Sequence, residues 1–257
     1  MPTELEYFPS PVYKRSVLRI RSLLAKEIAR LESIAQKKGR ASAIGKDNLG
    51  EELPRIRAFC REYHKAFMRY LDATLPQHKN GVQCKAGCGN CCHHFPMSVE
   101  PFELVEFYAN IRKSPDLILY LEECVFRTRT YYALLKSGEV RGEEDPEDFA
   151  LVSYFKKTLA CPFIRADGDC GTYSCRPVTC RMYFSETPGE FCVPEYLQTE
   201  KNRGFIVYLP DDVEWMIADL SAHYQELALP ESLYEGILSM NTLEPFFANA
   251  DSQGGEV

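Results

Sequence analysis

Apolar residues recur at helical spacing near the start of the chain. From Ser16 to Lys38 they fall three or four positions apart with Lys and Arg between them, which predicts an amphipathic helix. Residues 39–53, rich in Gly, Ser, Asp and Asn, predict a connector, and Pro54 predicts the start of a second helix. The apolar positions that define these helices are Val17, Ile20, Leu24, Ile28, Leu31, Ile34, Phe59, Tyr63, Phe67 and Leu71. A helical pair is therefore expected at the start of the chain.

The helical period returns further along, interrupted by two cysteine-rich segments. It predicts helices at about residues 101–113, 115–135, 149–155, 211–224 and 230–240, with an acidic loop at 137–148. Residues 205–209 form the one strand-like run, so any sheet is small. The predicted fold is mainly α, with irregular cysteine-rich loops and at most a small β element. We expect a helical pair at 1–80, a metal-binding domain at 81–195, and C-terminal helices at 196–257 that pack on the same core.

Composition and charge narrow the class of protein. The 257 residues are 45% hydrophobic and 26% charged, typical of a soluble globular protein. No apolar run approaches the roughly 20 residues that cross a bilayer, so we expect no membrane insertion. Residues 1–80 carry 16 Lys and Arg against 9 Asp and Glu, but the net charge is −7. A sequence pI near 5.4 and the lack of a reader motif argue against nucleic-acid binding.

The abnormal feature is the cysteine content. Eleven cysteines are an odd number and too few for a disulfide-stapled secreted scaffold. The N-terminus shows no secretory or transit pattern, which predicts a cytoplasmic location. Because thiols stay reduced there, clustered cysteines indicate metal binding or catalysis.

All but two of the cysteines lie in two windows. The first spans residues 84–94 and the second spans residues 161–192. Clustered thiolates repel one another without a cation, and their softness selects zinc, copper(I) or iron–sulfur clusters. Adjacent Cys91 and Cys92 would strain a single zinc tetrahedron, which favours a multi-iron cluster or two separate sites. The candidate ligands are Cys88, Cys91, Cys92, Cys161, Cys170 and Cys180, followed by Cys84 and Cys192.

The remaining thiols and imidazoles have simpler interpretations beside metal binding. Cys60 and His64 share a helix face and, like Cys124, fit a buried core. Cys175 is equally a free thiol or a ligand. His93 and His94 could ligate a metal, hydrogen-bond to ligating sulfurs or face solvent.

The two windows together resemble a known family. The first supplies Cys84, Cys88, Cys91 and Cys92 to a CxxCxxCC motif. The second resembles the pattern C-P-x-[LI] … C-x-[IV]-Y-x-x-R-P-x-x-C-R through Cys161, Pro162, Ile164, Cys170, Tyr173, Arg176, Pro177, Cys180 and Arg181. The chain is thus similar over residues 80–195 to the zinc- or iron-chelating CxxCxxCC family, also called the YkgJ family. The resemblance implies a bound iron–sulfur cluster, such as 4Fe-4S, or zinc. Relatives of the motif occur in flagellin lysine methylases.

Three residues of the second window are candidates for contact with the cofactor. A four-iron cluster with four thiolates is anionic, so Arg176 and Arg181 could offset its charge while Tyr173 donates a hydrogen bond to sulfur. Ordinary salt bridges are the alternative. Phosphate-loop, dinucleotide-binding and zinc-protease motifs are absent from the sequence. The sequence therefore predicts a metalloprotein with a redox or protein-modification role and an unidentified protein partner or substrate, or a structural zinc module that binds proteins.

Overall fold

The computed structural model describes residues 10–77, 81–85 and 87–253, and among them it contains eight α-helices and a two-stranded antiparallel sheet. The helices are α1 (Pro11–Lys38), α2 (Leu49–Thr74), α3 (Pro101–Ile111), α4 (Leu117–Arg141), α5 (Pro146–Phe155), α6 (Asp211–Ala222), α7 (Leu233–Thr242) and α8 (Glu244–Gln253). The strands are β1 (Tyr183–Ser185) and β2 (Gly204–Ile206). This confirms the predicted mainly α fold with a small β element.

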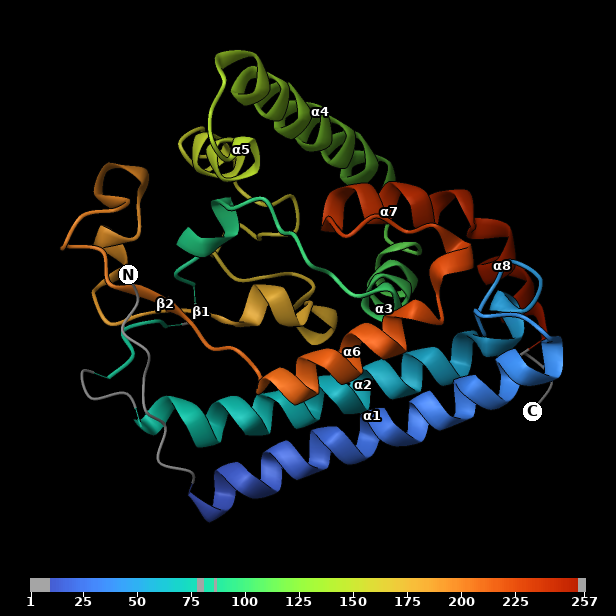
Figure 1. Cartoon of the computed structure of the whole chain (residues 1–257). Helices are drawn as coiled ribbons and strands as arrows, with labels where there is room; N and C mark the ends of the chain where they lie inside the picture. Colours follow the sequence, from blue (N-terminus) through green and yellow to red (C-terminus); the bar gives the residue numbers. More distant parts are fainter. Residues whose placement is uncertain (1–9, 78–80, 86, 254–257) are drawn as a thin grey trace.

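The helices form two groups with the irregular segments between them (Figure 1). At the base α1 and α2 pack along each other, and α6 packs on α1. At the opposite side α4 packs on α5 and α7, while α3 joins the groups through contacts with α2 and α7. The loops that carry the cysteines run through the space between these groups, so the helices form a frame around them.

Both ends of α1 follow from its sequence. The Ser10 side chain accepts the Tyr13 N–H at 3.1 Å, and Pro11 occupies the first helical position, where it loses no hydrogen bond. Gly39 ends the helix in the left-handed conformation, with φ 64°. The apolar stripe predicted for this helix is buried against α2 and α6: Val17, Ile20, Leu24, Ile28 and Leu31. The helix therefore starts five residues before the predicted Ser16.

The predicted connector at 39–53 is wrong at its end. α2 begins at Leu49, and Pro54 lies inside it rather than at its start. Leu49 and Leu53 are buried on the core side, and their burial offsets the one backbone hydrogen bond that a proline removes. The prediction relied on the preference of proline for the first turn of a helix. The burial of Leu49 and Leu53 instead extends the helix to Leu49.

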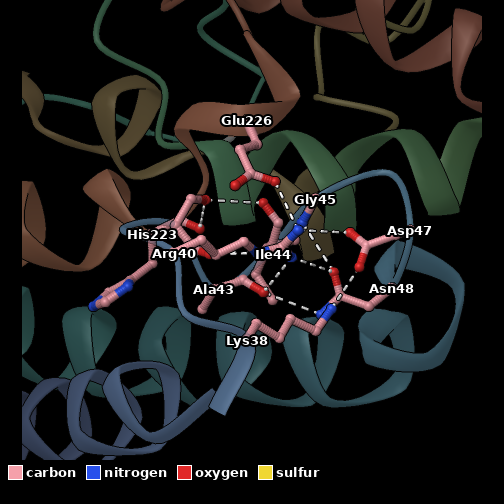
Figure 2. A network of polar contacts seen from close by, with 10 residues as sticks. Lys38, Arg40, Ala43, Ile44, Gly45, Asp47, Asn48, His223 and Glu226 are labelled. Atoms are coloured by element: carbon pink, nitrogen blue, oxygen red, sulfur yellow. Dashed lines mark hydrogen bonds and ion pairs between the residues drawn. The ribbon is translucent and has the colours of Figure 1, made fainter. Parts of the chain in front are cut away.

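Residues 40–48 fold against the C-terminal end of α6 and form an Arg40-centred loop (Figure 2). Arg40 donates to the carbonyl of Ser42 at 2.8 Å and to that of Ala43 at 3.1 Å. The same guanidinium pairs with Asp47 at 3.0 Å and with Glu226 at 2.9 Å. This segment is therefore a fixed part of the fold.

The backbone of this loop is also matched by partners. Asn48 accepts the Gly45 N–H at 2.9 Å and donates to the carbonyl of Ala43 at 3.0 Å. Ile44 is fully buried, and its N–H donates to the carbonyl of His223 at 2.9 Å. A polar segment can enter the interior in this way because its hydrogen-bonding groups have protein partners.

Three further boundaries differ from the predictions. α4 continues past residue 135 to Arg141 and ends at left-handed Gly142, so the acidic loop is shorter than predicted. α7 starts at Leu233 because the Ser232 side chain, rather than Pro230, caps it, and α8 was not predicted. β2 stops at Ile206 and pairs with Tyr183 of β1. Among the described residues, no helix is both long and apolar enough to span a bilayer.

Candidate metal centre

Five cysteines from the two windows line one cavity of about 50 Å³. They are Cys91, Cys92, Cys161, Cys170 and Cys180. The other walls are largely apolar and include Phe95, Met97, Phe107, Phe163 and Leu233. The structure therefore brings the two windows together.

Backbone contacts hold the windows against each other. The Cys161 N–H donates to the carbonyl of Cys92 at 2.8 Å. This backbone hydrogen bond joins a cavity cysteine of the second window to one of the first. The Gly87 N–H donates to a carboxylate oxygen of Asp169 at 2.7 Å. At Gly168, with φ +83°, an added Cβ would meet the carbonyl oxygen of Gly87. Glycine is therefore needed where the two loops cross.

Short turns present the cavity cysteines. Left-handed Gly89, with φ 62°, precedes a 3-10 turn at Asn90–His93 that carries Cys91 and Cys92. Cys170 lies opposite Ile164 in an isolated antiparallel bridge. Cys180 is part of a second 3-10 turn at Val178–Arg181. Each turn starts or closes in a few residues, so side chains from distant sequence positions can face one small space.

The other three candidate ligands lie beside this cavity without lining it. Cys88 is close to Gly189, where an added Cβ would come within 3.0 Å of its sulfur. The Asn90 side chain donates to the carbonyl of Gly189 at 2.6 Å and fixes this contact. Burial raises the pKa of the Cys84 thiol, and the nearby thiols of Cys91, Cys88 and Cys192 raise it further. The eight candidate ligands thus fall into a cavity set of five and a flanking set of Cys84, Cys88 and Cys192.

Arg176 is the cation of the cavity wall. Its Nη2 lies 4.0 Å from the Cys91 sulfur and also donates to the carbonyl oxygen of Cys180. A hydrogen bond with Cys92 lowers the pKa of the Cys91 thiol, and the Arg176 charge lowers it further against the effect of burial. Burial raises the pKa of Cys180 to about 12. The cavity therefore favours one thiolate by itself, and several thiolates need an added cation.

The other two predicted cofactor contacts shape the loop rather than line the cavity. Arg181 is buried, and it donates to the carbonyl of Arg176 at 2.7 Å and to that of Tyr173 at 2.6 Å. Its guanidinium lies 5.0 Å from the centre of the exposed Tyr173 ring. Arg181 and Tyr173 therefore hold the backbone on which Arg176 and Cys180 sit.

The structure distinguishes the two histidines whose roles the sequence left undecided. His94 lines the cavity and stacks between Phe155, at 4.0 Å between ring centres, and Tyr183, at 5.9 Å. Burial lowers the pKa of His94 to about 4, so its imidazole is neutral at pH 7. His93 is half-buried, and burial lowers its pKa as well.

Three further cysteines are buried but do not line the cavity. The Cys175 sulfur donates to the carbonyl of Thr172 at 3.4 Å, and the Cys60 sulfur lies 3.7 Å from His64 Nε2. Cys124 lies on α4 and is buried in the hydrophobic core, as predicted.

Sequence reasoning missed the apolar walls. Phe95 and Phe163 follow cavity residues closely in sequence, and aromatic residues next to cysteines could have signalled a sheltered site. Phe107 and Leu233 come from α3 and α7, and no local pattern connects them with the cysteines. Their role depends on how the helices pack.

The donor chemistry of the cavity fits zinc or iron. In the part of the chain that the structure describes, no three His, Cys, Asp or Glu side chains form a group that could hold a metal ion. A zinc ion binds thiolate sulfurs at about 2.3 Å, which brings the sulfurs within about 3.8 Å of one another. Binding a single zinc ion would therefore require the cavity cysteines to move closer together.

Comparison with known proteins identifies the region that holds this site. Residues 83–202 match the family model CxxCxxCC, described as a "putative zinc- or iron-chelating domain". The match includes both cysteine windows and every candidate ligand. Neither a curated protein nor a solved structure gives a match to the chain.

Proposed function

We propose that the chain, whose residues 83–202 match the zinc- or iron-chelating CxxCxxCC family, carries an iron–sulfur cluster in the cysteine-lined cavity. Cys91, Cys92, Cys161, Cys170 and Cys180 would supply its ligands. The protein would use this cluster in a redox or protein-modification role. Zinc in a structural, protein-binding module is the competing function.

The cavity that these five cysteines share is the observation that carries the proposal. One zinc ion takes four ligands, so five thiols exceed what a single structural zinc site uses. A buried water needs about 10–15 Å³ of such volume, and about 50 Å³ is therefore room for more than one atom-sized guest. An iron–sulfur cluster also takes four thiolates, so the volume of the cavity, rather than the number of thiols, favours a polynuclear guest.

The surrounding residues suit an anionic guest. Arg176 places a permanent positive charge next to Cys91 and offsets the negative charge of the thiolates. Phe107 and Phe163 pack edge to face at 4.9 Å and exclude water from one wall. Low polarity and nearby charge are the protein features that adjust a cluster's reduction potential. A bound cluster would supply one-electron transfer to a protein partner or substrate.

The test is purification and metal analysis without oxygen. We expect iron and acid-labile sulfide in fixed ratio to protein, with visible absorption that bleaches on reduction. A folded protein that contains neither iron nor sulfide and is colourless would contradict the proposal.

The same preparation distinguishes the zinc alternative. Zinc at a fixed stoichiometry, exchangeable with other divalent ions and without loss of fold in air, would assign the structural module instead. The control is a variant in which Cys124, a buried cysteine outside both windows, is replaced by Ala. Its metal content should equal that of the wild type.

A further inference from the structure

A buried hydrogen bond between a histidine and a glutamate lies next to the turn at Val178–Arg181 but outside the cavity. His64 of α2 and Glu103 of α3 are 4% and 1% exposed, and His64 Nε2 is 2.7 Å from Glu103 Oε1. A buried carboxylate costs free energy unless hydrogen bonds compensate for its lost hydration. Its position in the helical frame therefore calls for an explanation.

The same oxygen of Glu103 also binds the second cysteine window. Glu103 Oε1 accepts the backbone N–H of Val178 at 2.8 Å. Val178 begins the 3-10 turn that carries Cys180, and its two neighbours, Pro177 and Thr179, both line the cavity. The first N–H groups of a helical turn lack partners within the turn, so an outside acceptor fixes where the turn starts. Glu103 thus connects the frame to the cavity wall at one atom.

Glu103 is itself held in place from two sides. Its other oxygen faces the backbone N–H of Glu100 at 3.4 Å, which completes a capping box at the start of α3. His64 holds Oε1 from α2, and its Nδ1 is buried with no hydrogen-bond partner among the described residues. Because the Glu103 oxygen accepts, we assign a proton of His64 to Nε2.

We propose that Glu103 is a positioning residue for the metal site and that His64 orients it. This inference rests on the proposed metal binding and adds residues from the first half of the chain to the site. Glu103 places the Val178 peptide, and the turn that follows places Cys180 against the other cavity cysteines. Residues that orient metal ligands in this way typically change metal affinity about 10–100-fold when they are replaced.

Substitutions at Glu103 separate the hydrogen bond from the charge. Glu103→Met keeps the length of the side chain but removes the acceptor, and we expect metal affinity to fall about 10–100-fold. Glu103→Gln keeps an oxygen that accepts the Val178 N–H, and we expect its metal affinity to stay close to that of the wild type. Affinity and the rate of metal loss to a chelator are measured without oxygen after loading with ferrous iron and sulfide, and separately with Zn²⁺.

Glu106 provides a matched control on the same helix. It is 3% exposed, pairs with Arg57 at 2.8 Å and Arg61 at 3.3 Å, and does not line the cavity. Glu106→Met removes an equally buried carboxylate, so it should lower stability without faster metal loss. Measurement at temperatures where every variant is folded separates affinity from stability.

The possible failures are distinguishable. A wild type that takes up neither iron–sulfur nor zinc overturns the proposed function. A wild type that binds metal while Glu103→Met binds it equally well, or while Glu106→Met loses it equally fast, overturns the role of Glu103. If Glu103→Met does not fold, His64→Leu replaces it in the test. It should speed metal loss relative to Glu106→Met, and an unchanged rate would overturn the inference.

Discussion

The Arg40-centred loop and the cysteine-lined cavity are both irregular backbone held against the same helical frame. In the loop, the guanidinium of Arg40 meets carbonyls and carboxylates, and Asn48 completes the backbone pairing. In the cavity, five cysteines line one small space, and Arg176 lines it as well. The polar groups of the loop are matched by protein partners, whereas on the proposed function the cavity is completed by a bound metal.

This difference predicts how each region responds to damage. Breaking the loop should lower the stability of the fold and leave metal content unchanged. Breaking the cavity should lower both together, since metal-binding free energy is also folding free energy when the unfolded chain lacks a preformed site.

The largest effect is expected from the cavity. Cys170→Ser and Cys180→Ser each replace a soft thiolate by a hydroxyl, so both should lower metal content and soluble yield together. Metal at 1,000 times its dissociation constant stabilises the folded state by about 4 kcal/mol, and this contribution should be lost. Metal analysis and urea unfolding check the prediction. Wild-type metal content in both variants would contradict the ligand assignment.

A smaller effect is expected from the loop. Arg40→Met keeps much of the apolar stem but removes the guanidinium from two carbonyls and two carboxylates. The Ala43 carbonyl keeps its hydrogen bond from Asn48 and Asp47 keeps that from Lys38, whereas the Ser42 carbonyl and Glu226 lose the guanidinium contact. We expect unfolding free energy to fall by about 2–3 kcal/mol, the size usual for hydrogen bonds to a charged group. Metal per folded chain should not change. Arg55→Met, at an exposed position of α2, is the control and should change stability little. Equal losses in both variants would mean that the loop is not anchored by Arg40.

The same contrast explains what the sequence could predict. Most helices were predictable because their apolar stripes, such as Val17 to Leu31 in α1, are local patterns. The cysteine windows were predictable as a pair because thiol clustering is itself unusual. The fixed conformation of residues 40–48 was not predictable. In the sequence, Arg40 cannot be distinguished from a surface arginine, although it binds a carbonyl of its own loop and Glu226.

The limits at the candidate site have a related cause. Arg176, Tyr173 and Arg181 are close in sequence, and their spacing does not indicate which side chain faces the cavity. Backbone geometry decides it, because Arg181 turns inward to bind the carbonyls of Tyr173 and Arg176. Glu103 and His64 are separated from the cavity cysteines in sequence. The packing of α2 on α3 brings them together and places Glu103 at the turn that carries Cys180.

The smallest effect is expected at the exposed edge of the loop. Hydrogen bonds from Lys38 and Arg40 hold the pKa of Asp47 below its ordinary value. A carboxylate with a lowered pKa in the folded state stabilises that state above its unfolded pKa of about 3.9, and the contribution disappears as the pH falls through the folded pKa. Asp47→Asn should therefore cost less than about 1 kcal/mol at pH 7, since Asp47 is largely exposed, and progressively less below pH 4. Urea midpoints of wild type and variant at pH 7 and pH 3 measure the difference. An equal cost at both values would show that the Asp47 charge contributes nothing to the loop.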